Sequence, residues 1–511
     1  MGIPSKDYPD VVDIHTHVFN ARYLPLEGIF LSHLGKSSAF KRWLARTVAT
    51  VLEQATGSSY SREAVAAGRG FAGDDAADEI WKCVESELEA RTRGHVEAAG
   101  NSRSDREYAA DRLEEDPLVM ALLEGQAMLT ASGDDPEHPS AEDPSHRLDI
   151  DRILAGVRPT RRATLERVLN SGTFSGFGAV VKWLVKKLWK LFDTIAGWWE
   201  TADDFLMFFA RMLMAEKDVL AALIRSYDDD QHVRLLVHHM MDMQYAYDPP
   251  DAPRYLFAEQ EERMRKLAGD NKHRLVGFTA FDPRRQDVWT MPTGFTGVKF
   301  YPGMGYRPWD NTPDIQPRVA AFLRACAQSD VPVFAHCTPR GFQSQPGSGK
   351  NAHPKYWRAA LEQPGLRDLR LCLGHAGGGK MQNDDLLSYG WYATTPEEWA
   401  DRDNFARISV ELCTNFLNVY CELGHLHELL TDRKSRLAFE ANFVPAWKSV
   451  GPLPFATKCM FGSDHHMPLM INRAADLLTY FKDLFARESL DGFAAFCAGN
   501  ARTYLRLTAT S

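Results

Sequence analysis

The amino-acid sequence predicts an α/β protein: a (β/α)8 barrel of parallel strands with a large helical insertion after its first strand. Eight short apolar segments run along the chain, and helical patterns fall between several of them. Most of these segments are continuously apolar, which is typical of parallel strands covered on both faces. Several also end in a residue that could bind a metal ion. Together these observations predict a closed barrel with a site at the carboxyl ends of its strands.

The predicted strands and helices alternate from residue 233 onwards. The strands cover Val11–His17, Val233–Met243, Leu275–Pro283, Gly297–Pro302, Val331–Pro339, Leu369–Gly377, Ala406–Cys413 and Lys458–His466. The helical patterns cover Ala252–Ala268, Asp314–Ser329, Tyr356–Gln363, His425–Lys434 and Arg473–Glu488, and a last short helix within Asp491–Leu507 is expected to close the barrel. The barrel would therefore comprise residues 1–17 and 233–511.

Residues 18–232 separate the first two predicted strands, and this is far more chain than a crossover between parallel strands needs. Helical patterns in this insertion cover Ala39–Gln54, Ala76–Arg91, Asp105–Ser132, Ile150–Asn170 and much of Ala179–Tyr227. The polar stretch Gly133–His146 between them predicts a mobile loop. We expect a helical cap domain, inserted in the first strand-to-helix loop at the same end of the barrel as the site.

One segment of the insertion, Val180–Trp199, has the pattern of a basic amphipathic helix. Four lysines gather near one arc, and apolar residues fill the remainder. Such a helix can lie on a membrane surface, or it can pack on the rest of the protein or on a partner subunit. The charges interrupt the segment too often for a membrane span. We expect packing rather than membrane binding.

The composition is that of an ordinary globular protein, with 44% hydrophobic and 25% charged residues. A formal net charge of -9 argues against nucleic acid as the main partner. The eight cysteines form no C-x-x-C pair, which fits free thiols in a reducing compartment. No apolar segment typical of a signal peptide is evident at the N-terminus. These features predict a cytoplasmic protein. A homo-oligomer remains possible.

The pair His15–Thr16–His17 ends the first apolar segment. Alternate side chains of a strand point to the same face, so both imidazoles can reach one divalent metal ion. An isolated pair of this kind more often bonds to the backbone. The later strand ends make metal binding the stronger interpretation.

Three later predicted strands also carry a residue that could bind a metal ion near their ends: His336, His375 and Asp464. Imidazole is a common zinc ligand, and a carboxylate can bind a metal and also accept a proton from water. The alternatives are structural histidines and, for Asp464, an aspartate that caps the next turn.

Lys299 lies inside the apolar segment Gly297–Pro302, where an unpaired ammonium group is costly. If carbon dioxide carboxylates it, Lys299 becomes an anionic ligand that bridges two metals. If it stays an amine, it could hold a substrate carboxylate or pair with Asp464. The sequence leaves these options open.

Two further polar residues stand near strand ends. Arg340 follows His336 by four residues and could bind a substrate carboxylate with its guanidinium group, or be an ordinary surface arginine. Glu411, in the predicted seventh strand, could be a pocket acid or a paired core residue.

Several motifs resemble the amidohydrolase superfamily. They are D-I-H-T-H at Asp13–His17, G-V-K-F-Y-P at Gly297–Pro302, F-A-H-C-T-P at Phe334–Pro339, L-G-H-A-G-G at Leu373–Gly378, F-G-S-D at Phe461–Asp464 and A-G-N-A-R at Ala498–Arg502. They most resemble the amidohydrolase-related branch, which contains hydrolases and the aminocarboxymuconate-semialdehyde and resorcylate decarboxylases. The likeness covers residues 11–17 and about 233–507 and leaves the insertion unaccounted for.

The resemblance implies a metal site, with zinc as the first expectation and one or two ions. It places His15, His17, His336 and Asp464 on the metal, and makes His375 a second-metal ligand or the residue that orients and activates water. The segment around Lys299 also resembles the dihydroorotase strand with its carboxylated lysine, which leaves a two-metal site open.

The predicted function is a metal-dependent hydrolase that cleaves a C–N or C–O bond of a small, carboxylated molecule with water activated by the metal. Asp464 would take the proton and pass it to the leaving group, and His375 would stabilise the developing oxyanion. A metal-dependent decarboxylase is the close alternative. A third is a barrel scaffold whose insertion mediates interactions.

Overall fold

A computed structural model describes residues 9–66, 76–99, 112–144, 148–157, 174, 176–193, 202–247, 252–285, 289–383, 386–465, 467, 469–470 and 473–507. The chain divides into two compact units. The first unit comprises residues 1–18, 223–247 and 256–511, and the second comprises residues 19–222 and 248–255.

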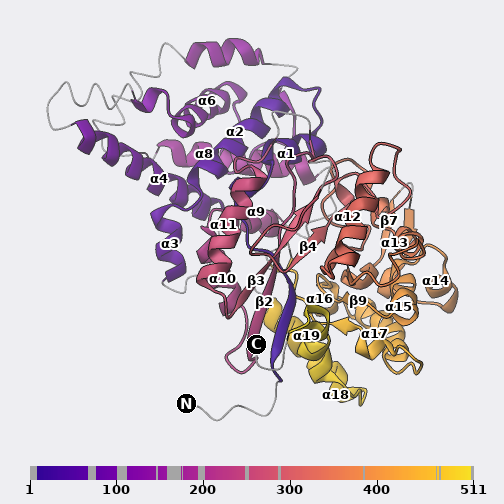
Figure 1. Cartoon of the computed structure of the whole chain (residues 1–511). Helices are drawn as coiled ribbons and strands as arrows, with labels where there is room; N and C mark the ends of the chain where they lie inside the picture. Colours follow the sequence, from indigo (N-terminus) through magenta and orange to yellow (C-terminus); the bar gives the residue numbers. More distant parts are fainter. Residues whose placement is uncertain are drawn as a thin grey trace. The chain divides into compact units, whose positions relative to one another are not determined.

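The first unit is an eight-stranded parallel barrel (Figure 1). Its strands are β1 (Val11–Thr16), β2 (Val233–His239), β3 (Leu275–Phe281), β4 (Gly297–Phe300), β5 (Val333–His336), β6 (Leu371–Gly374), β9 (Val419–Glu422) and β10 (Cys459–Met460), hydrogen-bonded in that order. β10 is linked back to β1 through the residues that follow it, because Ile14 N–H donates to the Phe461 carbonyl at 3.2 Å and Asp464 N–H donates to the His15 carbonyl at 2.8 Å. The predicted (β/α)8 barrel is therefore confirmed.

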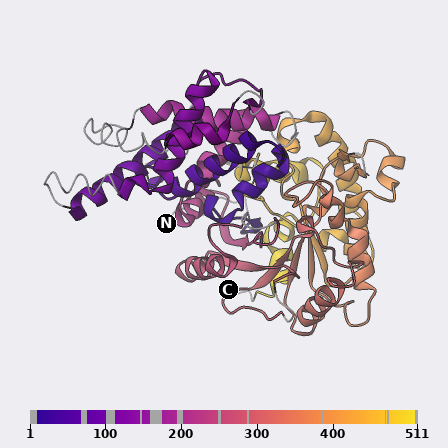
Figure 2. The same ribbon diagram turned by 90° about the horizontal axis from the view of Figure 1, so that it is seen from above.

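Helices surround the strands of the barrel (Figure 2). They are α11 (Phe257–Asp270), α12 (Gln316–Gln328), α13 (Pro354–Leu361), α14 (Pro396–Ala400), α15 (Phe405–Asn415), α16 (Glu428–Thr431), α17 (Arg433–Trp447), α18 (Ala474–Arg487) and α19 (Asn500–Leu505). A short antiparallel pair, β7 (Met381–Asn383) and β8 (Leu386–Ser388), follows β6.

The last helix closes one end of the barrel, as the sequence predicts. Ala501, Tyr504 and Leu505 of α19 pack in one buried cluster with apolar side chains from seven of the eight strands. The members from the strands are Val12, Ile14, Val237, Phe278, Phe334, Cys372, Tyr420 and Met460. This apolar cluster occupies the end of the barrel that α19 covers.

The predicted seventh strand, Ala406–Cys413, is wrong: this segment belongs to helix α15. The side chain of Asn404 accepts hydrogen bonds from the backbone N–H groups of Ala406 and Arg407, which caps the helix start. Its buried residues recur at helical rather than strand spacing, with Phe405, Ile408 and Leu412 on one face. The seventh strand is instead β9, which ends in Glu422. The predicted helix His425–Lys434 also differs, since α16 begins only at Glu428 and a separate long helix, α17, follows it.

The second unit is helical in its described residues (Figure 1). Its helices are α1 (Leu26–Leu34), α2 (Ala39–Ala55), α3 (Ser59–Ala66), α4 (Ala76–Ala99), α6 (Pro117–Ser132), α8 (Gly176–Asp193), α9 (Ala202–Met212) and α10 (Glu216–Arg225), the last of which continues into the barrel unit. Two predicted helices extend beyond the described residues. Residues 105–111 of the helix predicted at 105–132 and residues 158–170 of the helix predicted at 150–170 lie outside them.

Residues 180–193 of the basic amphipathic segment lie in α8, and residues 194–199 lie outside the described residues. Three of its four lysines, Lys182, Lys186 and Lys187, pair with acidic residues of the second unit. Lys187 is fully buried, and its ammonium group donates to Asp134 at 2.9 Å and to two oxygens of Ser140 at 3.0 Å. Lys186 pairs with Glu137 at 2.7 Å. Packing rather than a free basic face therefore explains this pattern. Among the described residues, no helix combines the length and the apolar character that crossing a bilayer requires.

Candidate metal centre

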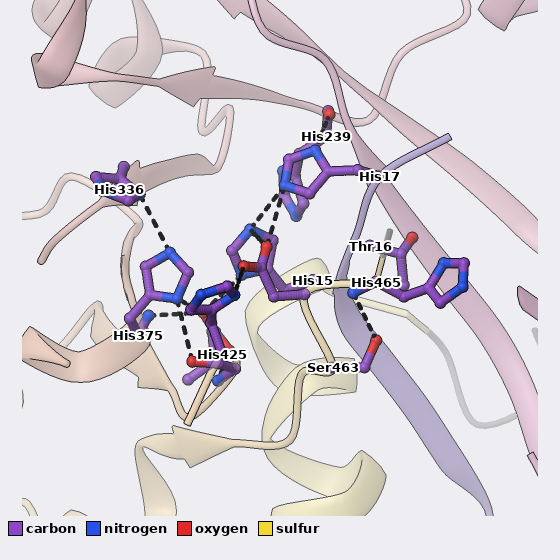
Figure 3. Close-up of polar contacts among 12 residues, drawn as sticks. His15, Thr16, His17, His239, His336, His375, His425, Ser463 and His465 are labelled. Atoms are coloured by element: carbon purple, nitrogen blue, oxygen red, sulfur yellow. Dashed lines mark hydrogen bonds and ion pairs between the residues drawn. The ribbon is translucent and has the colours of Figure 1, made fainter. Parts of the chain in front are cut away.

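The predicted ligands lie together at the carboxyl ends of the barrel strands. Figure 3 shows the four histidines among them, His15, His17, His336 and His375. His15 is the penultimate residue of β1, and His17 directly follows the strand. Lys299 lies in β4, and His336 is the last residue of β5. Strand register pairs His336 with Gly374 of β6, so His375 directly follows at the same level. Asp464 lies four residues after β10. All six side chains are buried, with residue exposures of 4% or less.

His15, His17 and Asp464 form a triangle of possible ligand atoms. The Nε2 atoms of the two histidines are 3.2 Å apart, and each lies 3.2 Å from Asp464 Oδ1. Ligand atoms at the usual distances from a tetrahedral zinc ion lie about 3.3 Å from one another. The triangle therefore has the size of one face of a zinc coordination shell.

Hydrogen bonds on the far side of each ring determine which nitrogen carries the proton. His15 Nδ1 lies 2.7 Å from a carboxylate oxygen of Glu422, and His17 Nδ1 lies 2.8 Å from the His239 carbonyl. Both partners are acceptors, so both Nδ1 atoms are the donors. Burial lowers the pKa of both rings, which keeps them neutral. The lone pairs of both Nε2 atoms then point toward each other and toward the Asp464 carboxylate. A cation between these atoms would offset the repulsion among their lone pairs.

His336 and His375 form a second pair built in the same way. His336 Nε2 donates to the Arg340 carbonyl at 2.7 Å, and His375 Nδ1 donates to the Gly424 carbonyl at 3.1 Å. Burial again lowers the pKa of both rings. The two remaining nitrogens, His336 Nδ1 and His375 Nε2, therefore face each other at 3.1 Å as acceptors (Figure 3). The resemblance to the amidohydrolase superfamily implies that His336 binds the same metal as His15, His17 and Asp464. In the structure, His336 contacts His375 instead.

Lys299 contacts the first triangle. Its Nζ atom lies 2.9 Å from His15 Nε2 and 4.4 Å from the centre of the Phe334 ring. Burial lowers the pKa of Lys299 to about 8. An amine with this pKa is uncharged in about a tenth of molecules at pH 7, far more than an ordinary lysine, and the uncharged amine is the form that reacts with carbon dioxide.

Sequence reasoning missed Glu422. Its side chain is fully buried, holds His15 Nδ1 and accepts the backbone N–H of His375 at 2.6 Å. The apolar segment Val419–Glu422 ends in this glutamate and could have identified it. Because the seventh strand was predicted at Ala406–Cys413, Glu411 was the candidate instead. Glu411 lies on α15 and pairs with Arg407 at 3.2 Å, away from the cluster.

His425 is a second residue that sequence reasoning missed. Its Nδ1 lies 3.0 Å from Asp464 Oδ2, the oxygen that does not face the triangle, and its side chain is 27% exposed. His375, His425 and Asp464 all have positive φ values, between 57° and 63°. Non-glycine residues adopt this conformation at a cost, and such residues concentrate at functional sites.

Arg340 is already engaged in the structure. Its NH1 group pairs with Glu428 at 2.6 Å, and its NH2 group donates to the Lys380 carbonyl. Glu428 also accepts from the Tyr392 hydroxyl at 3.1 Å. The guanidinium side chain is 40% exposed, so part of it faces solvent.

Comparison with known proteins connects the barrel to one family. Residues 255–507 match Amidohydro_2, described as amidohydrolase. No curated protein matches the chain.

Solved structures with some similarity include an amidohydrolase from Burkholderia multivorans with bound zinc, which is 15% identical, covers 57% of this chain and 88% of its own, and has a TM-score of 0.37. A probable 2-pyrone-4,6-dicarboxylic acid hydrolase from Acinetobacter baumannii is 16% identical, with 57% and 89% covered and a TM-score of 0.35. A 5-carboxyvanillate decarboxylase from Novosphingobium aromaticivorans, complexed with manganese, is 12% identical, with 67% and 91% covered and a TM-score of 0.34.

Proposed function

We propose, because residues 255–507 match the amidohydrolase family model, that the protein is a metal-dependent hydrolase that cleaves a C–N or C–O bond of a small, carboxylated molecule. One observation carries the proposal: three buried atoms of metal-binding type, His15 Nε2, His17 Nε2 and Asp464 Oδ1, lie 3.2 Å from one another. We propose that this triangle holds a divalent cation, with zinc favoured by its nitrogen-rich ligands.

A divalent cation bound there would supply Lewis acidity, which polarises a carbonyl group and makes water easier to deprotonate. Asp464 is the proposed proton acceptor, since its Oδ2 does not face the triangle. His425 lies beside that oxygen and is partly exposed, so it is placed to carry the proton between Asp464 and solvent.

His375 is proposed as a ligand rather than as an oxyanion donor. Its only N–H group is committed to the Gly424 carbonyl, so the nitrogen that faces the site has no proton to donate. We propose that His336 and His375 hold a second cation. A carboxylated Lys299 would supply the anionic oxygens between the two positions, because its amine already contacts His15.

A metal-dependent decarboxylase is the second candidate. The observation that favours it is that His15, His17 and Asp464 by themselves form a set of three ligand atoms, which suits one cation, while an unmodified Lys299 amine beside them could bind a carboxylate. Both reactions would use the same triangle. Arg340 is proposed as a further contact for a substrate carboxylate in either case, since part of its guanidinium group is exposed.

The insertion begins immediately after the ligand-bearing end of β1. This connectivity is the reason for proposing that it limits access of bulk water and shapes substrate entry.

The test is a metal analysis of the full chain purified without chelators, combined with peptide mass spectrometry at Lys299. The hydrolase proposal expects close to two ions per chain and the added mass of one carbon dioxide at Lys299. His15→Ala and His375→Ala should each lower the metal content, whereas His138→Ala, which changes an exposed histidine, should not. Wild-type protein that takes up no divalent metal contradicts both candidates.

A panel of carboxylated amides, lactones and aromatic acids separates the two reactions. Hydrolysis consumes water and yields two fragments or an opened ring. Release of carbon dioxide without water consumption, from protein with one ion and an unmodified Lys299, supports the decarboxylase instead.

A further inference from the structure

A fully buried carboxylate, Asp13, joins the two chain segments that carry the triangle. Its Oδ1 accepts the backbone N–H groups of His15 at 3.2 Å and Ser463 at 2.9 Å. Its Oδ2 accepts the hydroxyl groups of Ser463 and Tyr227, both at 2.6 Å. Four donors from three separate parts of the chain thus meet on one side chain.

The position of Asp464 depends on these contacts. Asp464 directly follows Ser463, and its backbone has a φ of 57°, which a non-glycine residue keeps only where neighbouring contacts hold it. Its N–H donates to the His15 carbonyl at 2.8 Å, and Asp13 binds His15 itself and Ser463, the residue directly before Asp464. The Ser463 hydroxyl in turn accepts the His465 N–H at 3.1 Å. The residues directly before and after Asp464 are therefore both held by hydrogen bonds.

Tyr227 brings a third segment to Asp13. It belongs to the stretch through which the chain enters β2, and this stretch is anchored on α18 as well: Gln231 Nε2 donates to the Ala475 carbonyl and the Thr479 hydroxyl, both at 3.1 Å. The Tyr227 side chain is buried, and no described residue other than Asp13 accepts its hydroxyl hydrogen in the hydrogen bonds of the structure. The hydroxyl therefore links the entry to β2 directly to the carboxylate behind the ligands.

We propose that Asp13 and Tyr227 are positioning residues that set the spacing of the metal-binding triangle, so that docking of residues 226–232 against the barrel controls the affinity for the metal. This inference rests on the proposed metal site. Neither residue contacts the ligand atoms themselves, so their effect is to hold the His15 and Asp464 backbones at the separation that one ion requires.

The test compares Tyr227→Phe with Tyr306→Phe. Tyr306 is another buried barrel tyrosine, whose hydroxyl donates to the Phe281 carbonyl. Each variant loses one buried hydrogen bond, so both should lower the melting temperature of the metal-free chain. Only Tyr227→Phe should speed amide hydrogen exchange at His15 and Asp464, by about three- to tenfold, as expected for one lost hydrogen bond.

Metal affinity is the second measurement. Tyr227→Phe should raise the dissociation constant for Zn²⁺ by about 10- to 100-fold, the usual effect of losing a group that orients a ligand. Tyr306→Phe should leave it within about twofold of wild type. The absorption spectrum of the Co²⁺-substituted chain should shift in the first variant only, because the ligand geometry changes.

A second pair of variants separates the carboxylate from the hydroxyl. Asp13→Asn places an amide donor against the hydroxyl donors and should reproduce the Tyr227→Phe effects more strongly. Asp10→Asn is the control, since Asp10 is an exposed residue just before β1 that pairs only with Arg234 among the contacts described.

Equal exchange rates at His15 and Asp464 in Tyr227→Phe and Tyr306→Phe would overturn the inference. Wild-type protein that binds no metal would instead contradict the proposed function. The exchange measurements are made on metal-free chains, so they decide the positioning role in that case as well.

Discussion

Glu422 and His15 are joined by a hydrogen bond of 2.7 Å between Oε1 and Nδ1, although 407 residues separate them in the sequence. The bond links β9 to β1 across the barrel end. It directs the lone pair of His15 Nε2 toward His17 and Asp464. A carboxylate behind an imidazole in this way raises the basicity of the ring and fixes its orientation for a metal ion.

Replacing Glu422 by glutamine should therefore weaken metal binding. The amide can still accept the His15 proton at its oxygen, but its NH2 group then faces the Gly424 N–H, which donates to Oε2 in the wild type. We expect the dissociation constant for Zn²⁺ to rise by about 10- to 100-fold, the usual effect of losing a group that orients a metal-binding histidine. Titration with a competing chelator measures it. Glu411→Gln, on α15, is the matched control and should bind metal like the wild type.

Gly462 should not tolerate a side chain. A Cβ atom there would lie 2.5 Å from Glu422 Oε2 and 2.9 Å from His15 Cβ, so one of these groups must move. Gly462→Ala should reduce both metal content and activity. Gly451→Ala should change neither, because no atom of the described residues lies within 4 Å of the corresponding Cβ position. Metal analysis and a melting curve of each variant provide the comparison, and normal metal content in Gly462→Ala would argue against the packing described.

His353 should make the barrel sensitive to acid. Its Nδ1 accepts the Lys355 N–H at the start of α13, its Nε2 contacts Asp403 at 3.0 Å, and burial lowers its pKa to about 4. The unfolded chain takes up this proton at about pH 6.5, so the folded state loses stability as the pH falls from about 6.5 to 4, by up to about 3 kcal/mol.

Chemical unfolding of His353→Gln at several pH values checks this expectation. The variant should be less stable than the wild type at pH 8, and the difference should shrink as the pH falls. A difference that stays constant between pH 8 and 4 would show that His353 does not contribute to acid sensitivity.

Glu53 should have the opposite effect in the helical unit. Burial raises its pKa to about 7, despite the nearby charges of Arg254 and Arg22. The folded chain then holds a proton that the unfolded chain has released, so stability falls as the pH rises from about 4.5 to 7. Glu53→Gln should raise the melting temperature at pH 8 and leave it nearly unchanged at pH 4. Glu63→Gln, an exposed glutamate in the same unit, should have little effect at either pH.

The barrel was predictable because its signal is local. Apolar segments of strand length, separated by helical patterns, reflect strands that are covered on both faces, and this requirement acts on each segment separately. The exception is instructive. Ala406–Cys413 is as apolar as a strand, and only the cap at Asn404 and the helical spacing of its buried residues identify α15.

His15, His17 and Asp464 were also within reach of the sequence, since each stands at or just beyond the end of an apolar segment and the ends of parallel strands meet. What only the tertiary structure decided is how these candidate ligands are grouped and which groups stand behind them. His336 faces His375, Glu422 stands behind His15, and Asp13 ties β1 to the loop of Asp464, all through contacts between segments far apart in the chain. Such contacts arise from strand order and register around the closed barrel, and no local pattern of residues encodes them.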